Sequence, residues 1–230
     1  MKVFCLPSAG TSASSFNQYG SGLNRDIELI PIDYPGHGLR IKEPLIQDME
    51  LLVQFVIDEI QTRICKGEKF IMLGHSLGAM VCYELARYIA EGKDIPNVSK
   101  FILCGCPAPN MIVGYLKGIS QLDDDSFVER IYQLGGLSDE VRENPFFKIF
   151  YLPILRNDFK LIARYEPVLS SFETTTIILS GTEDKLTRSN VLLWKLFAKN
   201  LEENILIEGN HFFVNRTEKM CQVLNKVVKI

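Results

Sequence analysis

Six short apolar runs, rich in β-branched residues, recur along the chain and constrain its fold more than any other feature. Runs of this length and composition are typical of β-strands. The segments between them have helical periodicity, and strands that alternate with helices favour parallel pairing and a sheet covered on both faces. The sequence therefore predicts an α/β fold with a doubly wound, mostly parallel sheet. The predicted strands are residues 2–6, 27–33, 70–74, 100–104, 175–181 and 204–208.

The length and charge of the chain limit its domain count and its partners. At 230 residues it has the size of one large α/β domain, and no segment has the composition of a linker, so we expect a single domain over residues 1–230. Hydrophobic residues make up 47%, enough to bury a sizeable core. The formal net charge of -3 supplies no basic face for phosphates, and we expect no nucleic-acid partner.

Targeting segments and cysteines set the expected compartment. The N-terminal apolar run is too short for a signal peptide, and no run approaches the roughly 20 apolar residues of a membrane helix. We therefore expect a cytoplasmic protein without a membrane partner. The six cysteines are scattered without metal-ligand spacing, which predicts free thiols and no metal site.

A G-x-S-x-G pattern at Gly74 to Gly78 joins the third predicted strand to a helical segment at 79–91. Such a strand–turn–helix unit strains the backbone of the serine and lifts its hydroxyl to the sheet edge, while the glycines prevent collisions with neighbouring backbone. The bare pattern arises by chance in roughly one chain in ten of this length. The strand and helix on either side make it specific, and we predict that Ser76 is a nucleophile.

A serine hydroxyl needs a base, and the chain has three histidines, His37, His75 and His211. His75 adjoins the serine, so its side chain should point away from it and have a structural role. His37 follows the second predicted strand; it could line the site, although a loop-fixing hydrogen bond is the favoured interpretation. His211 follows the last predicted strand, where the chain order Ser, Asp, His places the base. We predict that His211 is the general base.

The remaining groups of a serine hydrolase have candidates at other strand ends. Asp184 follows the fifth predicted strand and is predicted to accept the ring N–H of His211, with Glu183 as the alternative acid. The amide of Leu77, at the start of the helix after Ser76, can donate to an oxyanion. A second donor should come from the loop after the first strand, where Ala9 is the candidate.

The interval from about 111 to 168 breaks the alternation of strands and helices. It is long, has no strand pattern and carries many large apolar residues, among which Phe127, Ile131 and Leu134 should share one helix face. We predict a helical lid insertion over the carboxyl ends of the strands, where ligands bind in open α/β sheets. The alternative is a set of ordinary crossover helices packed on the sheet.

Together these segments resemble the type II (external) thioesterases of nonribosomal peptide and polyketide synthetases, which are α/β-hydrolases. The resemblance spans nearly the whole chain. Its most specific part lies in the predicted lid, at Leu134-Gly135-Gly136 and residues 152–159, which general lipases do not usually carry. The other motifs are Cys5 to Gly10, Tyr34 to Arg40 with Glu43-Pro44, Gly74 to Gly78, Gly181 to Asp184, Trp194, and Asn210 to Phe213.

The resemblance implies a substrate and a division of roles. The substrate would be an acyl group held as a thioester on the phosphopantetheine arm of an acyl or peptidyl carrier domain, and hydrolysis would clear stalled or misprimed units. Ala9 and Leu77 would form the oxyanion pair, no cofactor would be needed, and we expect a monomer. Synthase-embedded thioesterases keep their acid after the strand that follows the nucleophile helix. Here residues 103–107 contain no carboxylate, which supports Asp184.

Three residues depart from the family's pattern: Asn210 replaces a usual glycine, and Cys106 and His37 each replace a usual arginine. Asparagine tolerates positive φ, so the first departure is mild. Two other functions stay open at this stage. One is a small-molecule carboxylesterase or lipase with the same triad, because these residues alone do not separate an ester from a thioester. The other is a non-catalytic ligand-binding relative, against which the intact Ser76, Asp184 and His211 argue.

Overall fold

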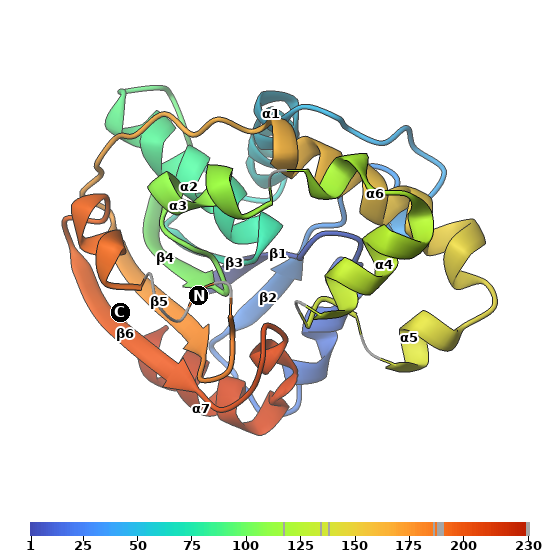
Figure 1. Ribbon diagram of the computed structural model, residues 1–230. Helices are drawn as coiled ribbons and strands as arrows, with labels where there is room; N and C mark the ends of the chain where they lie inside the picture. Colours follow the sequence, from blue (N-terminus) through green and yellow to red (C-terminus); the bar gives the residue numbers. More distant parts are fainter. Residues whose placement is uncertain (117, 134, 138, 186, 188–190, 229–230) are drawn as a thin grey trace.

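The computed structural model describes residues 1–116, 118–133, 135–137, 139–185, 187 and 191–228 (Figure 1). Within these ranges six strands form one sheet in the order β2-β1-β3-β4-β5-β6, and every neighbouring pair is parallel. The predicted parallel α/β sheet is therefore confirmed. The strands are β1 (Lys2–Leu6), β2 (Glu28–Pro31), β3 (Phe70–His75), β4 (Val98–Cys104), β5 (Thr175–Gly181) and β6 (Leu201–Ile207).

The predicted strands and the observed ones differ most at the two edges of the sheet. β2 is shorter than the predicted 27–33, and β6 begins before the predicted 204. Each edge strand pairs with a single neighbour, and β6 alternates between partly buried and exposed residues. Because Glu202, Glu203 and Asn204 are polar, the continuous apolar signal covers only part of the strand.

Helices cover both faces of the sheet (Figure 1). On one face α1 (Met49–Gln61) and α2 (Leu77–Ala90) pack on a large apolar cluster that includes Phe4 and Phe101. On the opposite face η1 (Ala13–Tyr19) and α7 (Thr217–Val227) enclose a second apolar cluster. The doubly wound arrangement is therefore confirmed, and each cluster contains residues from several strands.

Helix α1 shows how local sequence sets one of these elements. The Asp48 side chain accepts a hydrogen bond from the Leu51 amide at 3.1 Å and caps the helix start. The apolar positions at helical spacing are buried against the sheet; these are Met49, Leu52, Val53, Val56 and Ile60. Ile64 continues this spacing in the sequence but lies beyond the last helical residue, Gln61.

The segment between β4 and β5 is helical, as predicted. Its outer helices pack on a small apolar cluster of their own that contains Phe127 and Ile131, whereas Leu134 lies outside the described residues. The carboxyl-terminal half of the last helix packs instead into the large cluster through Leu161 and Ile162, as a crossover helix would. The helices are α3 (Pro109–Tyr115), η3 (Ile119–Gln121), α4 (Asp124–Gln133), α5 (Asp139–Glu143), η4 (Phe147–Tyr151) and α6 (Leu152–Arg164).

The strand order places a crevice between β1 and β3. From β1 the chain continues to β2 on one side, whereas from β3 it continues through β4 to β6 on the other. The loops after β1 and β3 therefore diverge, and ligands of open α/β sheets bind at such a switch point. The loop after β1 contains Ala9, and the turn after β3 contains Ser76. None of the described helices is long and apolar enough to cross a membrane.

Candidate active site

Ser76 is held in a strained turn between β3 and α2. Its backbone angles are φ 52° and ψ -109°, and of the described residues other than glycine it alone has a positive φ. Such a conformation costs about 1–3 kcal/mol and persists only where the surroundings impose it. A Cβ at Gly74 would lie 2.3 Å from the Gly78 carbonyl oxygen, and one at Gly78 would lie 2.2 Å from the Leu6 carbonyl oxygen. Both glycines are therefore required for the turn to pack against β1 and α2.

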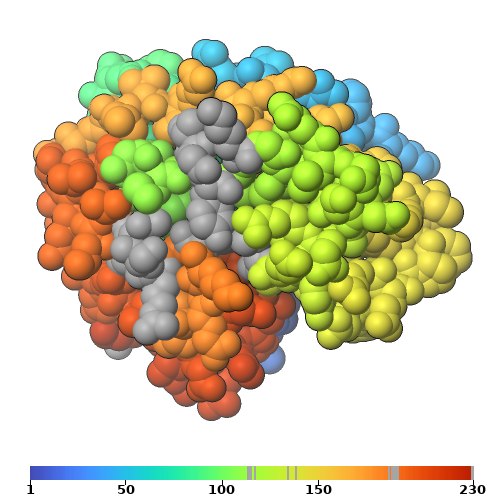
Figure 2. Space-filling view, viewed as in Figure 1, coloured from blue at the N-terminus to red at the C-terminus, as the bar shows by residue number. Residues whose placement is uncertain are grey.

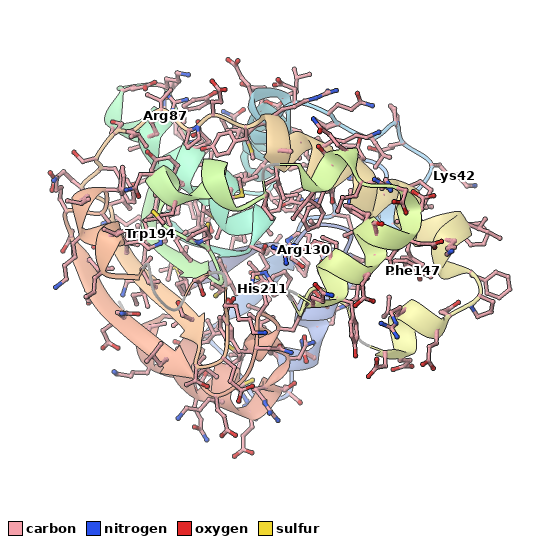
Figure 3. The ribbon with its side chains drawn as sticks, viewed as in Figure 1. Lys42, Arg87, Arg130, Phe147, Trp194 and His211 are labelled. Atoms are coloured by element: carbon pink, nitrogen blue, oxygen red, sulfur yellow. The ribbon has the colours of Figure 1, made fainter. Side chains whose placement is uncertain are left out.

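His211 and Asp184 form a buried pair. The Nδ1–H of His211 donates to Asp184 Oδ2 at 3.0 Å, and the imidazole lies near the centre of the molecule, among the ends of the strands (Figure 3). Asp184 is 1% exposed, and the same oxygen accepts the Thr187 hydroxyl at 2.8 Å. The carboxylate is thus fixed by two donors and sets the orientation of the ring. Sequence reasoning had missed Thr187, whose short polar side chain gives no recognisable signal.

Ser76 and His211 line the same apolar cavity, which has a volume of about 70 Å³. Within the described part of the chain, the Ser76 hydroxyl makes no hydrogen bond to the His211 ring. Catalytic hydrogen bonds are often long without substrate and tighten when it binds. The structure thus brings Ser76, His211 and Asp184 together at one rim of the sheet, from the ends of β3, β6 and β5.

The predicted oxyanion donors, Ala9 and Leu77, lie in the loop after β1 and at the start of α2. The Gly78 amide donates to the Pro7 carbonyl at 3.1 Å, which ties the turn around Ser76 to the loop after β1. Leu77 is the first residue of α2, so its amide has no partner within the helix. No described residue accepts a hydrogen bond from the amide of Ala9 or of Leu77. Both amides thus remain candidates for the predicted oxyanion donors.

His75 packs beside His211, with ring centroids 5.1 Å apart, and supports it. Its Nε2–H donates to the main-chain carbonyl of His211 at 2.9 Å. Burial, and then the neighbouring His211 ring, lowers the pKa of His75 to about 3, so this imidazole is neutral. A Cβ at Gly105, which has φ +57°, would lie 3.2 Å from the His75 ring and 3.3 Å from the His211 ring. The backbone after β4 thus packs closely against both imidazoles.

His37 belongs to a different cluster. Its Nε2–H donates to Asp158 Oδ2 at 2.9 Å and its Nδ1–H to the Pro35 carbonyl at 3.1 Å, which agrees with the loop-fixing interpretation. The same Asp158 oxygen accepts the Gly10 amide at 2.7 Å. Sequence reasoning had assigned no role to Asp158, because its partners lie far away in the chain.

Two of the departures from the family's pattern fit their surroundings. Positive φ at the loop before His211 lies at Gly209, with φ +134°, and not at Asn210, so tolerance of positive φ does not explain the asparagine. Instead, Asn210 Oδ1 accepts the Phe212 amide at 2.9 Å and closes a local turn. Cys106 is buried, and its carbonyl accepts the Trp194 indole N–H at 3.1 Å.

Two hollows meet at this rim of the sheet. The cavity that contains Ser76 is apolar, whereas a wider groove of about 730 Å³ runs between the loop after β1, residues 135–137 and the loop around Phe212. Figure 2 shows the surface indented between the yellow-green helices and the red C-terminal part. Gly136 borders both hollows. The apolar side chains of the cavity are Met80, Ile112, Leu116, Ile131, Phe159 and Ile162.

Among the described residues, no group of three or more His, Cys, Asp or Glu side chains could hold a metal ion. The six cysteines are free thiols, as expected, and five of them are buried.

Comparisons with known proteins identify the family. The probable anguibactin biosynthesis thioesterase AngT of Vibrio anguillarum is 28% identical over 228 residues, which cover 95% of this chain and 87% of the relative. The gramicidin S biosynthesis protein GrsT of Aneurinibacillus migulanus is 28% identical over 235 residues, with coverage of 99% and 90%. The crystal structure of ClbQ from the colibactin NRPS/PKS pathway superposes with a TM-score of 0.89 at 26% identity, covering 99% and 96% of the two chains. The thioesterase domain matches residues 1–230, and the chain therefore belongs to the thioesterase domain family, whose members are hydrolases.

Proposed function

We propose that this protein hydrolyses acyl thioesters carried on the phosphopantetheine arm of synthetase carrier domains and so clears stalled or misprimed acyl groups. In this proposal Ser76 is the nucleophile, His211 the general base and Asp184 the acid that orients it, while Ala9 and Leu77 supply the oxyanion donors. The observation that carries the proposal is the strained Ser76 turn beside the buried His211–Asp184 pair. The names of AngT and GrsT, which place them in anguibactin and gramicidin S biosynthesis, and that of ClbQ, from an NRPS/PKS pathway, support the choice of carrier-bound substrates.

Acylation follows from this arrangement. Ser76 Oγ attacks the thioester carbonyl while His211 Nε2 takes its proton, and Asp184 stabilises the resulting imidazolium. The carbonyl oxygen becomes an oxyanion, to which the Ala9 and Leu77 amides donate. The C–S bond then breaks, and His211 returns the proton to the leaving sulfur. A thiol with a pKa of about 8.5 leaves more readily than an alkoxide, so this machinery suffices.

Deacylation repeats the same steps with water. His211 takes a proton from a water molecule as that water attacks the acyl-serine carbonyl, and then returns it to Ser76 Oγ as the acid is released. All five groups come from one chain, and we propose that the enzyme acts as a monomer.

The two hollows suit the two parts of such a substrate. The groove is wide and open, with backbone amides and polar side chains such as Asn144 and Arg216 along it, which suits the amide-containing arm. The cavity beside Ser76 is apolar and suits the acyl group. On this proposal the insertion forms the roof of the acyl cavity, since Ile131 and Phe159 come from α4 and α6.

The test offers the purified chain three substrates: an acyl-loaded carrier protein, a free acyl thioester and a nitrophenyl ester. We expect the carrier-bound thioester to have the highest kcat/KM and Ser76→Ala to abolish turnover. Preference for the ester alone would contradict the thioesterase proposal and favour a carboxylesterase.

Labelling with a fluorophosphonate separates an enzyme from a binding protein. We expect modification of Ser76, identified by mass spectrometry, and none in Ser76→Ala. A wild-type chain that stays unlabelled would mean that Ser76 is not activated by His211, and the proposal would be wrong.

A further inference from the structure

Helix α6 meets the loop after β1 at Asp158. Asp158 is 3% exposed, and its Oδ2 accepts the Gly10 amide at 2.7 Å. A Cβ at Gly10 would lie 2.6 Å from Leu155 Cδ1, so α6 also packs directly on this loop. Gly10 follows Ala9, the proposed oxyanion donor. The Thr11 amide donates to the Ser8 carbonyl at 3.2 Å and closes a turn around Ala9 and Gly10. The hydrogen bond from the Gly10 amide to Asp158 anchors this turn, and so restricts the direction of the Ala9 N–H within it.

His37 holds the Asp158 carboxylate in place. Both ring nitrogens of His37 face acceptors, Nε2 the Asp158 carboxylate at 2.9 Å and Nδ1 the Pro35 carbonyl at 3.1 Å. Both can be satisfied only if both nitrogens carry protons, which makes His37 an imidazolium. The histidine is 3% exposed, so the ion pair is shielded from water. Its charge also compensates the buried carboxylate.

We propose that Asp158 is a positioning residue for the reaction, clamped by protonated His37, and that it orients the Ala9 amide toward the oxyanion by holding the Gly10 amide. The inference rests on the proposed role of Ala9. The clamp joins three separate segments, the loop after β1, the loop after β2 and helix α6. Loss of the proton from His37 would leave Asp158 held by fewer donors, so the clamp should loosen at high pH.

The direction of the pH effect follows from the groups around His37. Burial lowers its pKa, but the hydrogen bond and charge of Asp158, the Pro35 carbonyl and the charge of Asp33 outweigh burial and raise the pKa above its ordinary value. The Tyr34 ring packs edge-on against His37, and burial raises the pKa of that phenol well above its usual range, so it stays neutral. The clamp is therefore formed below the raised pKa of His37 and opens as the pH rises through it.

The first test compares Asp158→Ala and Asp158→Asn with Asn157→Ala. Asn157 is the matched control, because its side chain also ties α6 to the body, through the Ile46 carbonyl at 2.7 Å. It meets Asp158 only through a 3.5 Å hydrogen bond to Oδ1, whereas Gly10 and His37 bind Oδ2. We expect Asp158→Ala to lower kcat about 10- to 100-fold with KM nearly unchanged, and Asn157→Ala to stay within about 3-fold of wild type. Asp158→Asn retains an acceptor oxygen for Gly10 and should recover part of the loss. Equal losses in Asp158→Ala and Asn157→Ala would reduce Asp158 to a general anchor of α6 and overturn the inference.

Both an acyl-loaded carrier protein and a nitrophenyl ester are used, because the oxyanion forms at the same place with each. A wild-type chain that hydrolyses only the ester would refute the carrier-bound substrate, and the comparison of variants would still decide the inference on the ester.

The second test uses His37→Gln and remains informative if Asp158→Ala does not fold. Glutamine keeps an N–H donor for Asp158 but does not titrate. In the wild type we expect kcat to fall at alkaline pH as His37 loses its proton. His37→Gln should lack this alkaline fall. An alkaline limb that is the same in both proteins would show that His37 does not control kcat and would overturn its part in the clamp.

Discussion

Replacement of Asp184 by asparagine tests the proposed triad with a minimal change of shape. Asp184 is almost fully buried, and its Oδ2 accepts the His211 Nδ1–H at 3.0 Å and the Thr187 hydroxyl at 2.8 Å. In Asp184→Asn the side-chain amide can donate to His211 Nδ1, which favours the tautomer with its proton on Nε2. A protonated Nε2 cannot accept the Ser76 proton, so the base is lost although the side chains stay in place.

The size of the effect follows from the role of the carboxylate. In the proposed triad Asp184 sets the tautomer and stabilises the imidazolium, and both contributions vanish in the amide. For a Ser-His-Asp constellation the loss in kcat is on the order of 10⁴-fold, equivalent to about 5 kcal/mol in the activation barrier. Because the change leaves the two hollows beside Ser76 intact, KM should change little.

The assay measures single-turnover acylation and steady-state kcat for Asp184→Asn beside Glu183→Gln. Glu183 is the adjacent carboxylate and is exposed, so its replacement controls for loss of charge in this loop. We expect Glu183→Gln to remain close to wild type. A kcat for Asp184→Asn within about tenfold of wild type would refute the assignment of the acid, since no such triad tolerates the wrong tautomer at that cost. A large loss in Glu183→Gln would move the assignment to Glu183.

Three further predictions concern packing and specificity. Gly78→Ala should yield little folded protein, because its Cβ would meet the Leu6 carbonyl oxygen at 2.2 Å. The control Gly67→Ala has no heavy atom within 4 Å of its Cβ and a φ of +81°, so urea unfolding should show a loss of only about 1 kcal/mol in the free energy of unfolding. The pKa of His75 is lowered to about 3, so below about pH 6.5 the unfolded chain binds a proton that the folded chain does not. The free energy of unfolding should therefore fall by up to about 1.4 kcal/mol per pH unit on acidification. Urea unfolding at pH 7 and pH 5 should show a smaller fall in this free energy for His75→Gln than for the wild type. Phe159→Ala should enlarge the apolar cavity and raise the kcat/KM ratio of a longer acyl chain over acetyl by about tenfold, and an unchanged ratio would mean that the acyl group lies elsewhere.

The elements that the sequence predicts well are those with a local physical cause. The strands β1 and β5 agree with the predicted bounds, because continuous apolar runs mark strands buried on both faces. The start of α1 was predictable, since Asp48 caps it within three residues. The turn at Ser76 was predictable for the same reason, because Gly74 and Gly78 meet neighbouring backbone whatever the rest of the chain does.

The contacts that the sequence does not predict join residues far apart in the chain. His37 and Gly10 both meet Asp158 across more than a hundred residues, and no spacing rule connects them. Within the insertion the apolar residues alone do not indicate which side is buried: Phe147 is 2% exposed, whereas Phe146 and Phe150 are 58% and 59% exposed. The π-helical turn at Phe147–Tyr151 departs from the period of an α-helix, so helical spacing assigns the wrong faces there.

The contacts around Ser76 divide the candidate site into two parts with different support. Ser76, Leu77 and the loop after β1 are locked together by the close approach of Gly78 to Leu6 and by the hydrogen bond from Gly78 to Pro7. The proposed nucleophile and one proposed oxyanion donor are therefore built into the sheet itself. Ala9 lies farther along that loop, where the next amide is held by Asp158 from the insertion. Among the described helices of the insertion, α6 alone makes a hydrogen bond to the loop after β1, through Asp158, which accepts the Gly10 amide. Changes that reach the site through α6 should therefore alter the chemical step. Changes in the outer helices of the insertion should instead alter substrate binding.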